Sequence, residues 1–269
     1  MTAVDLLLVG FGKMGGAMLA GWQVAGTVRR VVVVDPAAVS MPVKGDTLVV
    51  ADASGVPADF SPAAVVMAVK PQVMDQALPA YAPFARHAVF LSIAAGKTIG
   101  YFQQVLGRDA ALVRAMPNTP AAVGRGISGA YATDAVSPGQ RDLCHRLLSG
   151  LGEVVWVGDE GMIDAVTAVS GSGPAYVFHM VEALASAGQA AGLPADLALR
   201  LARATVTGAG ELLYRTPETT ATQLRVNVTS PNGTTQAALD VLMAKEGGLT
   251  ALMTRAVHEA ARRSRELAG

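Results

Sequence analysis

The stretch that decides the fold is Leu6-Leu7-Leu8-Val9-Gly10-Phe11-Gly12-Lys13-Met14-Gly15, close to the start of a chain of 269 residues. The first four residues form a continuous apolar run, which is typical of a β-strand buried on both faces. Glycines at 10, 12 and 15 follow with the spacing Gly-x-Gly-x-x-Gly, and residues Met14–Ala25 show the apolar periodicity of a helix. A strand, this glycine spacing and a helix in that order predict a site for a dinucleotide cofactor.

Each glycine has a physical task in such a site. We expect Gly10 to make the tight turn, Gly12 to let the backbone approach the pyrophosphate, and Gly15 to let helix and strand pack closely. The pyrophosphate would lie at the helix N-terminus, where free N–H groups and the helix dipole favour an anion. The alternative is a glycine turn with a purely structural role. The predicted cofactor-binding residues here are Gly10, Phe11, Gly12, Lys13, Met14 and Gly15.

Asp35 ends the second predicted strand, about 20 residues beyond the glycines. A carboxylate at this position accepts hydrogen bonds from the ribose 2′-hydroxyl of NAD and repels the 2′-phosphate of NADP. Arg29 and Arg30 precede the strand and should lie at its other end. We therefore predict good use of NADH, with NADPH as the other cofactor. A carboxylate that only caps the turn into Pro36 is the competing interpretation.

Two further segments leave predicted strands at their carboxyl ends, the edge of a parallel sheet where nucleotides bind. The segment Ala68-Val69-Lys70-Pro71 is expected to line the cofactor with its backbone and to bring Lys70 to a phosphate or ribose. A solvated surface position for Lys70 is the alternative. The small residues of Ser92-Ile-Ala-Ala95-Gly96 would let the backbone at Ala95 approach the nicotinamide half. Asn118 completes the predicted cofactor-binding set.

The first half of the chain alternates apolar runs with helical patterns. The predicted strands are Leu6–Val9, Val31–Val34, Thr47–Val50, Ala64–Ala68, Ala88–Ile93, Ala111–Ala115, Ile127–Tyr131 and Glu153–Val157. Predicted helices between them include Met14–Ala25, Ile99–Leu106 and Pro138–Leu151. This order predicts an α/β Rossmann domain, a doubly wound and mostly parallel sheet with helices on both faces.

Strand signals stop after about Gly158, and patterns with a period near 3.6 follow. The predicted helices are Met162–Val169, Pro174–Ala191, Pro194–Leu213, Glu218–Val226, Thr235–Ala244 and Leu249–Leu267. We therefore expect two domains, a dinucleotide-binding Rossmann domain over residues 1–158 and an all-helical domain over residues 159–269.

The composition excludes several classes of function. Lys plus Arg and Asp plus Glu both number 21, so a formal net charge of zero gives no electrostatic case for nucleic acid or an anionic membrane. The single cysteine, Cys144, excludes an intrachain disulfide and a cysteine-cluster metal site. Neither a membrane-spanning apolar run nor a leader pattern is found, so we expect a cytoplasmic protein. An apolar fraction of 51% indicates buried helix surface and a subunit interface.

The stretch Val228-Thr-Ser-Pro-Asn-Gly-Thr-Thr-Gln-Ala-Ala-Leu239 places hydroxyls, a proline and a glycine just ahead of an apolar helical pattern. The first N–H groups of a helix lack internal partners, so such a segment can hold a small carboxylate. A helix that is merely well capped is the alternative, because Ser, Thr and Asn are common caps. Met116–Pro120 and Ser170–Tyr176 are two more segments dense in Gly, Pro, Ser and Thr.

With these segments the chain resembles pyrroline-5-carboxylate reductase over nearly its whole length. The resemblance rests on six segments in order, Gly10–Gly15, Ala68–Pro71, Ser92–Gly96, Met116–Pro120, Ser170–Tyr176 and Val228–Thr235. It implies a Rossmann domain followed by a helical dimerisation domain, with helices of both chains building each active site. It also implies reduction of 1-pyrroline-5-carboxylate to L-proline, the last step of proline biosynthesis, with NADPH or NADH. Many members assemble further into a decamer, and the sequence leaves open the subunit number and feedback by proline.

The resemblance also implies substrate contacts. In the family a Ser-Pro-Gly-Gly-Thr-Thr segment binds the substrate carboxylate with backbone N–H groups and a serine hydroxyl, and the second threonine places its hydroxyl on the ring nitrogen. Asn232 stands where the family usually has glycine, and Asn tolerates the left-handed backbone better than most residues, so the turn should survive. The implied substrate-binding residues are Glu160, Asn227, Ser230, Gly233, Thr234 and Thr235, with Thr235 also the catalytic candidate.

The implied reaction delivers hydride to a protonated cyclic imine, so the chain must supply positioning and a hydrogen-bond partner at nitrogen more than a strong acid. Three alternatives compete with it. One is reduction of a related cyclic imine carboxylate. A β-hydroxyacid dehydrogenase would require a lysine in the helix Pro174–Ala191, which contains none. A cofactor-binding redox sensor without catalysis would not need the hydroxyl-rich segment that holds Ser230 and Thr235.

Overall fold

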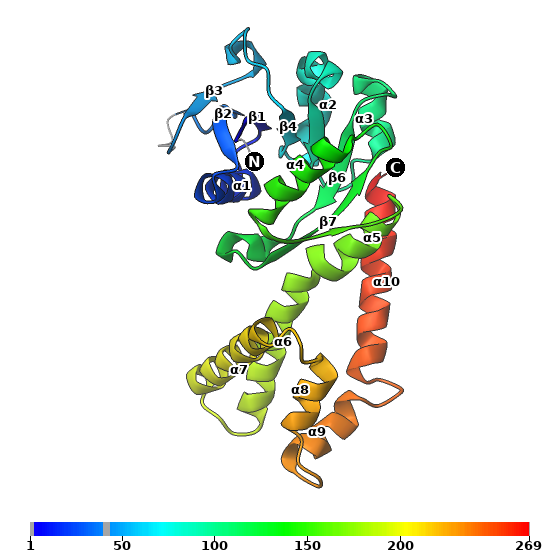
Figure 1. Cartoon of the computed structure of the whole chain (residues 1–269). Coiled ribbons are helices and arrows are strands. Elements are labelled where there is room, and N and C mark those ends of the chain that lie inside the picture. Colours follow the sequence, from blue (N-terminus) through cyan, green and yellow to red (C-terminus); the bar gives the residue numbers. More distant parts are fainter. Residues whose placement is uncertain (1–2, 40–43, 269) are drawn as a thin grey trace. The chain divides into compact units, whose positions relative to one another are not determined.

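The computed structural model describes residues 3–39 and 44–268 (Figure 1). By its internal contacts the chain forms two compact units. We call Met1–Gly171 with Ala260–Gly269 the sheet unit, and Ser172–Glu259 the helical unit. The predicted domain boundary after residue 158 marks where the strand pattern ends, and the last strand ends just before it, at Trp156. That boundary stays a prediction about the domains.

Within the described residues, the sheet unit contains one eight-stranded sheet in the order β3-β2-β1-β4-β5-β6-β7-β8 (Figure 1). Neighbouring strands are parallel except β6 and β7, which are antiparallel. The prediction of a doubly wound, mostly parallel sheet is confirmed, and each predicted strand is present. The strands are β1 (Val4–Val9), β2 (Val28–Val34), β3 (Thr47–Val50), β4 (Ala64–Met67), β5 (Val89–Ser92), β6 (Leu112–Met116), β7 (Gly126–Ala132) and β8 (Gly152–Trp156).

Both faces of the sheet carry a hydrophobic core, which explains the uninterrupted apolar runs. Successive side chains of a strand point to opposite faces. In β1, Leu6 and Leu8 therefore pack under α1 (Lys13–Ala25) and α4 (Pro138–Ser149). Leu7 and Val9 pack on the other face. That second face is covered by α2 (Met74–Ala77), the 3₁₀ segment η3 (Leu78–Arg86) and α3 (Ile99–Leu106).

A π-helical turn interrupts the first helix after the sheet. The sequence predicts one helix over Met162–Val169, whereas the structure has α5 (Met162–Val166) followed by the π-turn η5 (Thr167–Gly171). The Thr167 hydroxyl donates to the Ile163 carbonyl at 2.7 Å, and the Ser170 hydroxyl donates to the Val166 carbonyl at 2.9 Å. These side-chain bonds to the backbone carbonyls accompany the local change of helix type.

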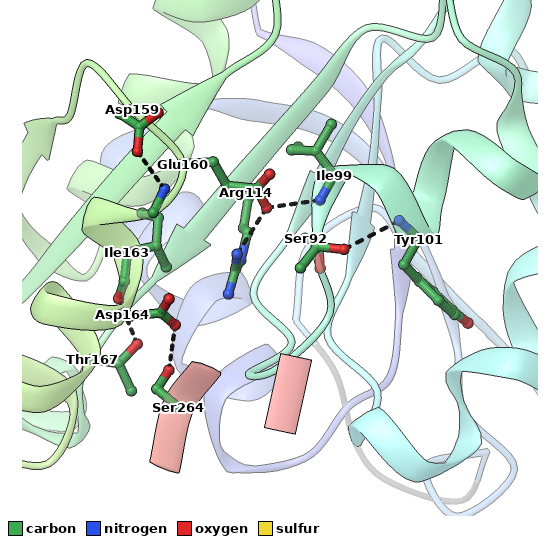
Figure 2. Close-up of polar contacts among 12 residues, drawn as sticks. Ser92, Ile99, Tyr101, Arg114, Asp159, Glu160, Ile163, Asp164, Thr167 and Ser264 are labelled. Carbon is green, nitrogen blue, oxygen red and sulfur yellow. Dashed lines mark hydrogen bonds and ion pairs between the residues drawn. The ribbon is translucent and has the colours of Figure 1, made fainter. Parts of the chain in front are cut away.

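The chain end also belongs to the sheet unit. In α10 (Leu249–Ala268), the Ser264 hydroxyl donates to Oδ1 of Asp164 over 2.6 Å, and both residues are buried (Figure 2). Further along α10, the Leu267 carbonyl lies 2.9 Å from where a Cβ on Gly96 would be. Gly96 has a φ of +73° and leaves no room for a side chain. The end of α10 therefore packs against the loop after β5.

The helical unit consists of helices (Figure 1), and few of their apolar side chains are buried. Its helices are α6 (Gly173–Ala190), α7 (Ala195–Arg215), α8 (Ala221–Asn227), α9 (Thr234–Leu242) and the first part of α10. Throughout Ser172–Glu259, where every residue is described, the buried apolar side chains are those of Ala185, Ala198 and Ala202. Many large apolar side chains are instead exposed, Phe178 at 64% and Leu199 at 50% among them. No helix among the described residues is long and apolar enough to cross a membrane.

Candidate active site

The glycine loop between β1 and α1 has the geometry that a dinucleotide requires. Gly10 has a φ of +98°, and a Cβ there would lie 2.7 Å from backbone atoms of Ala68 and Val69. A Cβ on Gly15 would lie 2.3 Å from the Gly10 carbonyl oxygen. Around Gly12, in contrast, no described atom comes within 4 Å of a Cβ position. Gly10 and Gly15 are thus required by the protein's own packing, and Gly12 faces open space at the N-terminus of α1, where a pyrophosphate fits.

Asp35 bridges this loop to the turn after β2. Its Oδ2 accepts a hydrogen bond from the Phe11 N–H at 2.7 Å, and its Oδ1 accepts one from the Ala37 N–H at 2.8 Å. The carboxylate therefore caps the turn that contains Pro36, as the competing interpretation held, and it is also fixed beside the glycine loop. Both features suit a ribose-binding carboxylate, and the contact with ribose stays a prediction. Arg29, as expected, lies at the other end of β2, paired with Asp5.

A cavity of about 540 Å³ opens at the same edge of the sheet. It lies beyond the carboxyl ends of β1, β2 and β3 and beside the segment after β4, where the adenosine half of a dinucleotide binds in doubly wound folds. Lys70 is exposed and is not one of the residues that line it. Lining residues include Val9, Val34, Pro36, Ala51, Asp52, Val69 and Tyr81.

The loops after β5 and β6 lie next along this edge. Ala95 is exposed between the buried Ala94 and the close contact at Gly96, so its backbone is accessible from solvent. Asn118 is buried, and its side chain makes two hydrogen bonds: Oδ1 accepts from the Ile127 N–H at 2.9 Å, and Nδ2 donates to the Ser170 carbonyl at 3.2 Å. The Asn118 side chain therefore ties β7 to the π-turn, and its contact with the cofactor stays a prediction.

Glu160 forms a polar junction inside the sheet unit (Figure 2). Its Oε1 accepts a hydrogen bond from the Arg114 guanidinium at 2.8 Å and another from the Ile99 N–H at 2.8 Å. The Arg114 side chain is only 5% exposed, whereas that of Glu160 is 26% exposed. A buried guanidinium requires a charged partner, so Glu160 has a structural task at β6 and the start of α3 in addition to the substrate contact implied by the resemblance.

The segment before α9 forms a tight turn in the helical unit. Asn232 has a φ of +59°, the left-handed conformation expected for it, and is the sole described residue other than glycine with a positive φ. The Gly233 N–H donates to the Ser230 carbonyl at 3.0 Å. A Cβ on Gly233 would lie 2.3 Å from the Ser230 hydroxyl oxygen, so a larger residue there would require the Ser230 side chain to rotate. Because its N–H is engaged in the turn, Gly233 is a weaker carboxylate donor than the sequence suggests.

The N-terminus of α9 is open. Gly233 caps the helix with an extended backbone and without any side-chain hydrogen bond. The N–H groups of Thr234, Thr235 and Gln236 have no acceptor among the described residues. Such groups attract an anion through their unpaired N–H bonds and the helix dipole.

Two hydroxyls and an amide accompany this helix end. Neither the Ser230 nor the Thr235 hydroxyl has a hydrogen-bond partner in the described part of the chain. Asn227 is exposed at the end of α8, and its Oδ1 accepts a hydrogen bond from the Gln223 amide at 2.8 Å. One helix N-terminus thus offers free N–H groups for a carboxylate and free hydroxyls for a ring nitrogen.

Sequence reasoning missed the polar groups that hold these loops in place. Arg114 stands within the apolar strand Leu-Val-Arg-Ala-Met, and a charge inside such a run was the available signal. Asp164 and Ser264 are 100 residues apart, so no local pattern could pair them. Among the described residues, no group of three or more His, Cys, Asp or Glu could hold a metal ion.

Comparisons with known proteins show which family the chain resembles. Residues 160–267 match the family model described as pyrroline-5-carboxylate reductase dimerisation. The chain is 38% identical to the pyrroline-5-carboxylate reductase of Pseudomonas aeruginosa over 271 aligned residues, which cover 100% of this chain and 98% of that protein.

Solved structures give the same result. The chain is similar to a pyrroline-5-carboxylate reductase from Coxiella burnetii, with a TM-score of 0.89 and 31% identity over 100% of both chains. It is also similar to the pyrroline carboxylate reductase of Plasmodium falciparum with NADP bound, with a TM-score of 0.80 and 25% identity over 100% of both chains.

Proposed function

The chain belongs to the pyrroline-5-carboxylate reductase family, and we propose how its residues carry out that family's reaction. The enzyme reduces 1-pyrroline-5-carboxylate to L-proline with NADPH or NADH, the last step of proline biosynthesis. The observation that carries our assignment of roles is the open N-terminus of α9, with three free N–H groups next to the free hydroxyls of Ser230 and Thr235. A five-membered imine with one carboxylate presents the matching groups.

The helical unit supplies the substrate contacts in this proposal. The N–H groups of Thr234 and its neighbours bind the substrate carboxylate together with the Ser230 hydroxyl, and Gly233 leaves space for that hydroxyl. Thr235 places its hydroxyl on the ring nitrogen, which positions the imine and favours its protonated form. Asn227 completes the contacts from the helical unit. Glu160 of the sheet unit is a further proposed substrate contact, through the carboxylate oxygen that Arg114 does not engage.

The sheet unit supplies the cofactor contacts. The backbone at Gly12 and the N-terminus of α1 bind the pyrophosphate, and the Asp35 carboxylate binds the adenosine ribose. When bound, the reduced nicotinamide supplies the hydride. The proposed cofactor contacts are Gly10, Phe11, Gly12, Lys13, Met14, Gly15, Asp35, Ala68, Val69, Lys70, Pro71, Ala95 and Asn118.

The enzyme is a homo-oligomer, as its dimerisation domain indicates. We propose a dimer through the helical unit, because a unit with three buried apolar side chains cannot form a stable core alone. We further propose that these dimers assemble into a decamer, as the resemblance to the family implies. We place the reaction in the cytoplasm, since the single thiol, Cys144, is free and buried and needs no oxidising compartment.

The direct test follows the absorbance of reduced cofactor during incubation with 1-pyrroline-5-carboxylate, in NADH and NADPH separately. We expect substrate-dependent oxidation, formation of L-proline, and a higher kcat/KM with NADH. Folded protein that oxidises neither cofactor would rule out the enzyme assignment. A higher kcat/KM with NADPH would contradict the role of Asp35.

A second assay separates the proposed substrate from a related one. The six-membered homologue of the imine carries the same carboxylate and nitrogen in a larger ring. We expect the five-membered substrate to have the higher kcat/KM. The reverse order would assign the chain to the related cyclic imine instead.

A further inference from the structure

A second carboxylate, Asp52, lies at the adenosine edge of the sheet unit. The parallel register pairs Val34 with Val50, and the Asp35 N–H donates to the Val50 carbonyl at 3.0 Å. Asp35 and Ala51 therefore leave β2 and β3 at the same level, and Asp52 is the next residue along the chain. The sequence pattern gave no reason to connect Asp52 with a cofactor, because only the register brings the ends of these two strands together.

Local hydrogen bonds fix the Asp52 carboxylate and keep it charged. Its Oδ1 accepts from the Ser54 N–H at 2.8 Å and from the Ser54 hydroxyl at 2.5 Å. These bonds cap the 3₁₀ turn η1 (Ala53–Gly55) and hold the pKa of the Asp52 carboxyl below its usual range. The Gly55 backbone N–H also lowers the pKa of this carboxyl, so the turn holds the carboxylate from several sides. Asp52 is thus an ionised and oriented carboxylate at this edge of the sheet unit.

Asp52 lines the cavity of about 540 Å³ at the adenosine edge of the sheet. Asp52 and Ser54 line it together with Pro36, the residue after Asp35. Most other lining residues are apolar or small, which suits the flat adenine ring. None of the described lining residues is Lys or Arg. A 2′-phosphate entering this cavity would therefore meet a fixed negative charge and no lining cation.

We propose that Asp52 is a second specificity-determining residue of the cofactor site, whose carboxylate disfavours a 2′-phosphate on the adenosine ribose. Asp35 and Asp52 then act together. Asp35 binds the ribose hydroxyls beside the glycine loop, and Asp52 adds repulsion from the β3 side of the cavity. This inference rests on the proposed function, since it concerns the cofactor of that reaction.

The repulsion from Asp52 should add to that from Asp35 and should depend on salt. A phosphate monoester carries close to two negative charges at neutral pH. Repulsion from one carboxylate several ångströms away in solvent lowers affinity for it by about tenfold. Added salt screens charges of this kind, because the Debye length falls from about 10 Å at 0.1 M to 3 Å at 1 M. Selectivity against the 2′-phosphate should therefore fall as ionic strength rises.

The test uses the full chain and two fragments of the cofactor, 5′-AMP and adenosine 2′,5′-bisphosphate, with dissociation constants from calorimetry at low salt. We expect Asp52→Asn to tighten binding of the bisphosphate about tenfold and to change 5′-AMP binding less than twofold. Asparagine keeps the acceptor for Ser54, so the 3₁₀ turn is preserved. Asp59→Asn is the matched control, because Asp59 is exposed in the same connection and does not line the cavity.

The outcomes separate this inference from the proposed function. Asp35→Asn combined with Asp52→Asn should relax selectivity further than either variant alone, and 0.5 M salt should reduce the effect of both. Suppose that the parent binds 5′-AMP and NADH. If Asp52→Asn then leaves the ratio of the affinities for the bisphosphate and for 5′-AMP unchanged, or changes it no more than Asp59→Asn does, Asp52 has no role in selectivity. If the parent binds neither 5′-AMP nor NADH, the cofactor half of the proposed function fails as well.

Discussion

At the scale of single residues, the turn before α9 shows how a substitution can be absorbed. Asn232 occupies a left-handed backbone position, φ +59°, where the family usually has glycine. Asparagine enters this region more readily than most residues because its short polar side chain makes local hydrogen bonds. At Gly233, the next residue, a Cβ would displace the Ser230 hydroxyl from its present position. The turn thus tolerates a side chain at position 232, whereas a side chain at position 233 would move a hydroxyl that the proposed site uses.

Thr235 is the residue on which the proposed chemistry depends most. Thr235→Ala removes the hydroxyl assigned to the ring nitrogen and leaves the backbone of α9 in place. We expect kcat/KM to fall by about 10- to 100-fold, the loss of one hydrogen bond to a reacting group, about 1–3 kcal/mol. Steady-state kinetics with 1-pyrroline-5-carboxylate measure this, and the dissociation constant of NADH should stay unchanged.

Thr234→Ala provides the control for that variant. Thr234 precedes Thr235 in the same helical turn, and its assigned role belongs to its backbone N–H, which alanine retains. We expect kcat/KM within about threefold of the parent, since only weak helix-propensity terms change. Equal losses in the two variants would mean that Thr235 has no special role at the nitrogen.

At the scale of elements, a buried ion pair connects β6, α3 and the segment before α5. Glu160→Ala leaves the Arg114 guanidinium buried without its charged partner and removes the acceptor for the Ile99 N–H. We expect the free energy of unfolding, measured by urea denaturation, to fall by about 2–4 kcal/mol. Glu160→Gln should lose less, because its amide oxygen can still accept both hydrogen bonds.

Two further variants test that explanation. Glu153→Ala in β8 removes an exposed carboxylate that has no ion-pair partner within the described range, so it should change the free energy of unfolding by less than about 0.5 kcal/mol. Adding Arg114→Met to Glu160→Ala should recover part of the lost stability, since no buried charge then remains unpaired. Stability equal to the parent in Glu160→Ala would contradict the structural role of this junction.

At the scale of the whole molecule, the helical unit requires a partner surface. Phe178 lies in α6 and is 64% exposed in the single chain. If α6 lies in the dimer interface, Phe178→Glu places a charge in that interface, which should dissociate the oligomer. Sedimentation velocity should show a lower sedimentation coefficient and molar mass, and enzymatic activity should fall as the oligomer dissociates. Val24→Glu is the control, because Val24 is 92% exposed in the sheet unit and should leave the assembly intact.

The stability of the whole molecule should fall in alkaline solution. Burial raises the pKa of the Cys144 thiol from 9.0 to about 12, so the folded state keeps this thiol protonated where the unfolded state releases the proton. Its contribution is complete below pH 9 and is lost between about pH 9 and pH 12. The parent should lose about 1–2 kcal/mol more between pH 7.5 and pH 10 than Cys144→Ala does. Urea denaturation at the two pH values gives this difference, and equal losses would mean that Cys144 titrates normally.

Local pattern predicted the elements well, for a definite physical reason. A strand buried on both faces must be apolar throughout, so runs such as Leu6–Val9 are visible without any tertiary information. The glycine spacing is equally local, because Gly10, Gly12 and Gly15 all act within one strand–turn–helix unit. The π-turn at Thr167–Gly171 was not predicted, because Thr167 and Ser170 also fit a regular helical pattern.

The sequence by itself therefore determined the sheet, the helices, the cofactor fingerprint and the polar turn before α9. Only the tertiary structure decided that Asn118 accepts from Ile127, that Arg114 meets Glu160, that Asp164 meets Ser264, and that Asp52 lies at the end of β3 beside Asp35. The difference is one of range. A local pattern records which face of an element is buried, whereas a hydrogen bond or ion pair between residues far apart in the chain exists only after the sheet register has brought its partners together.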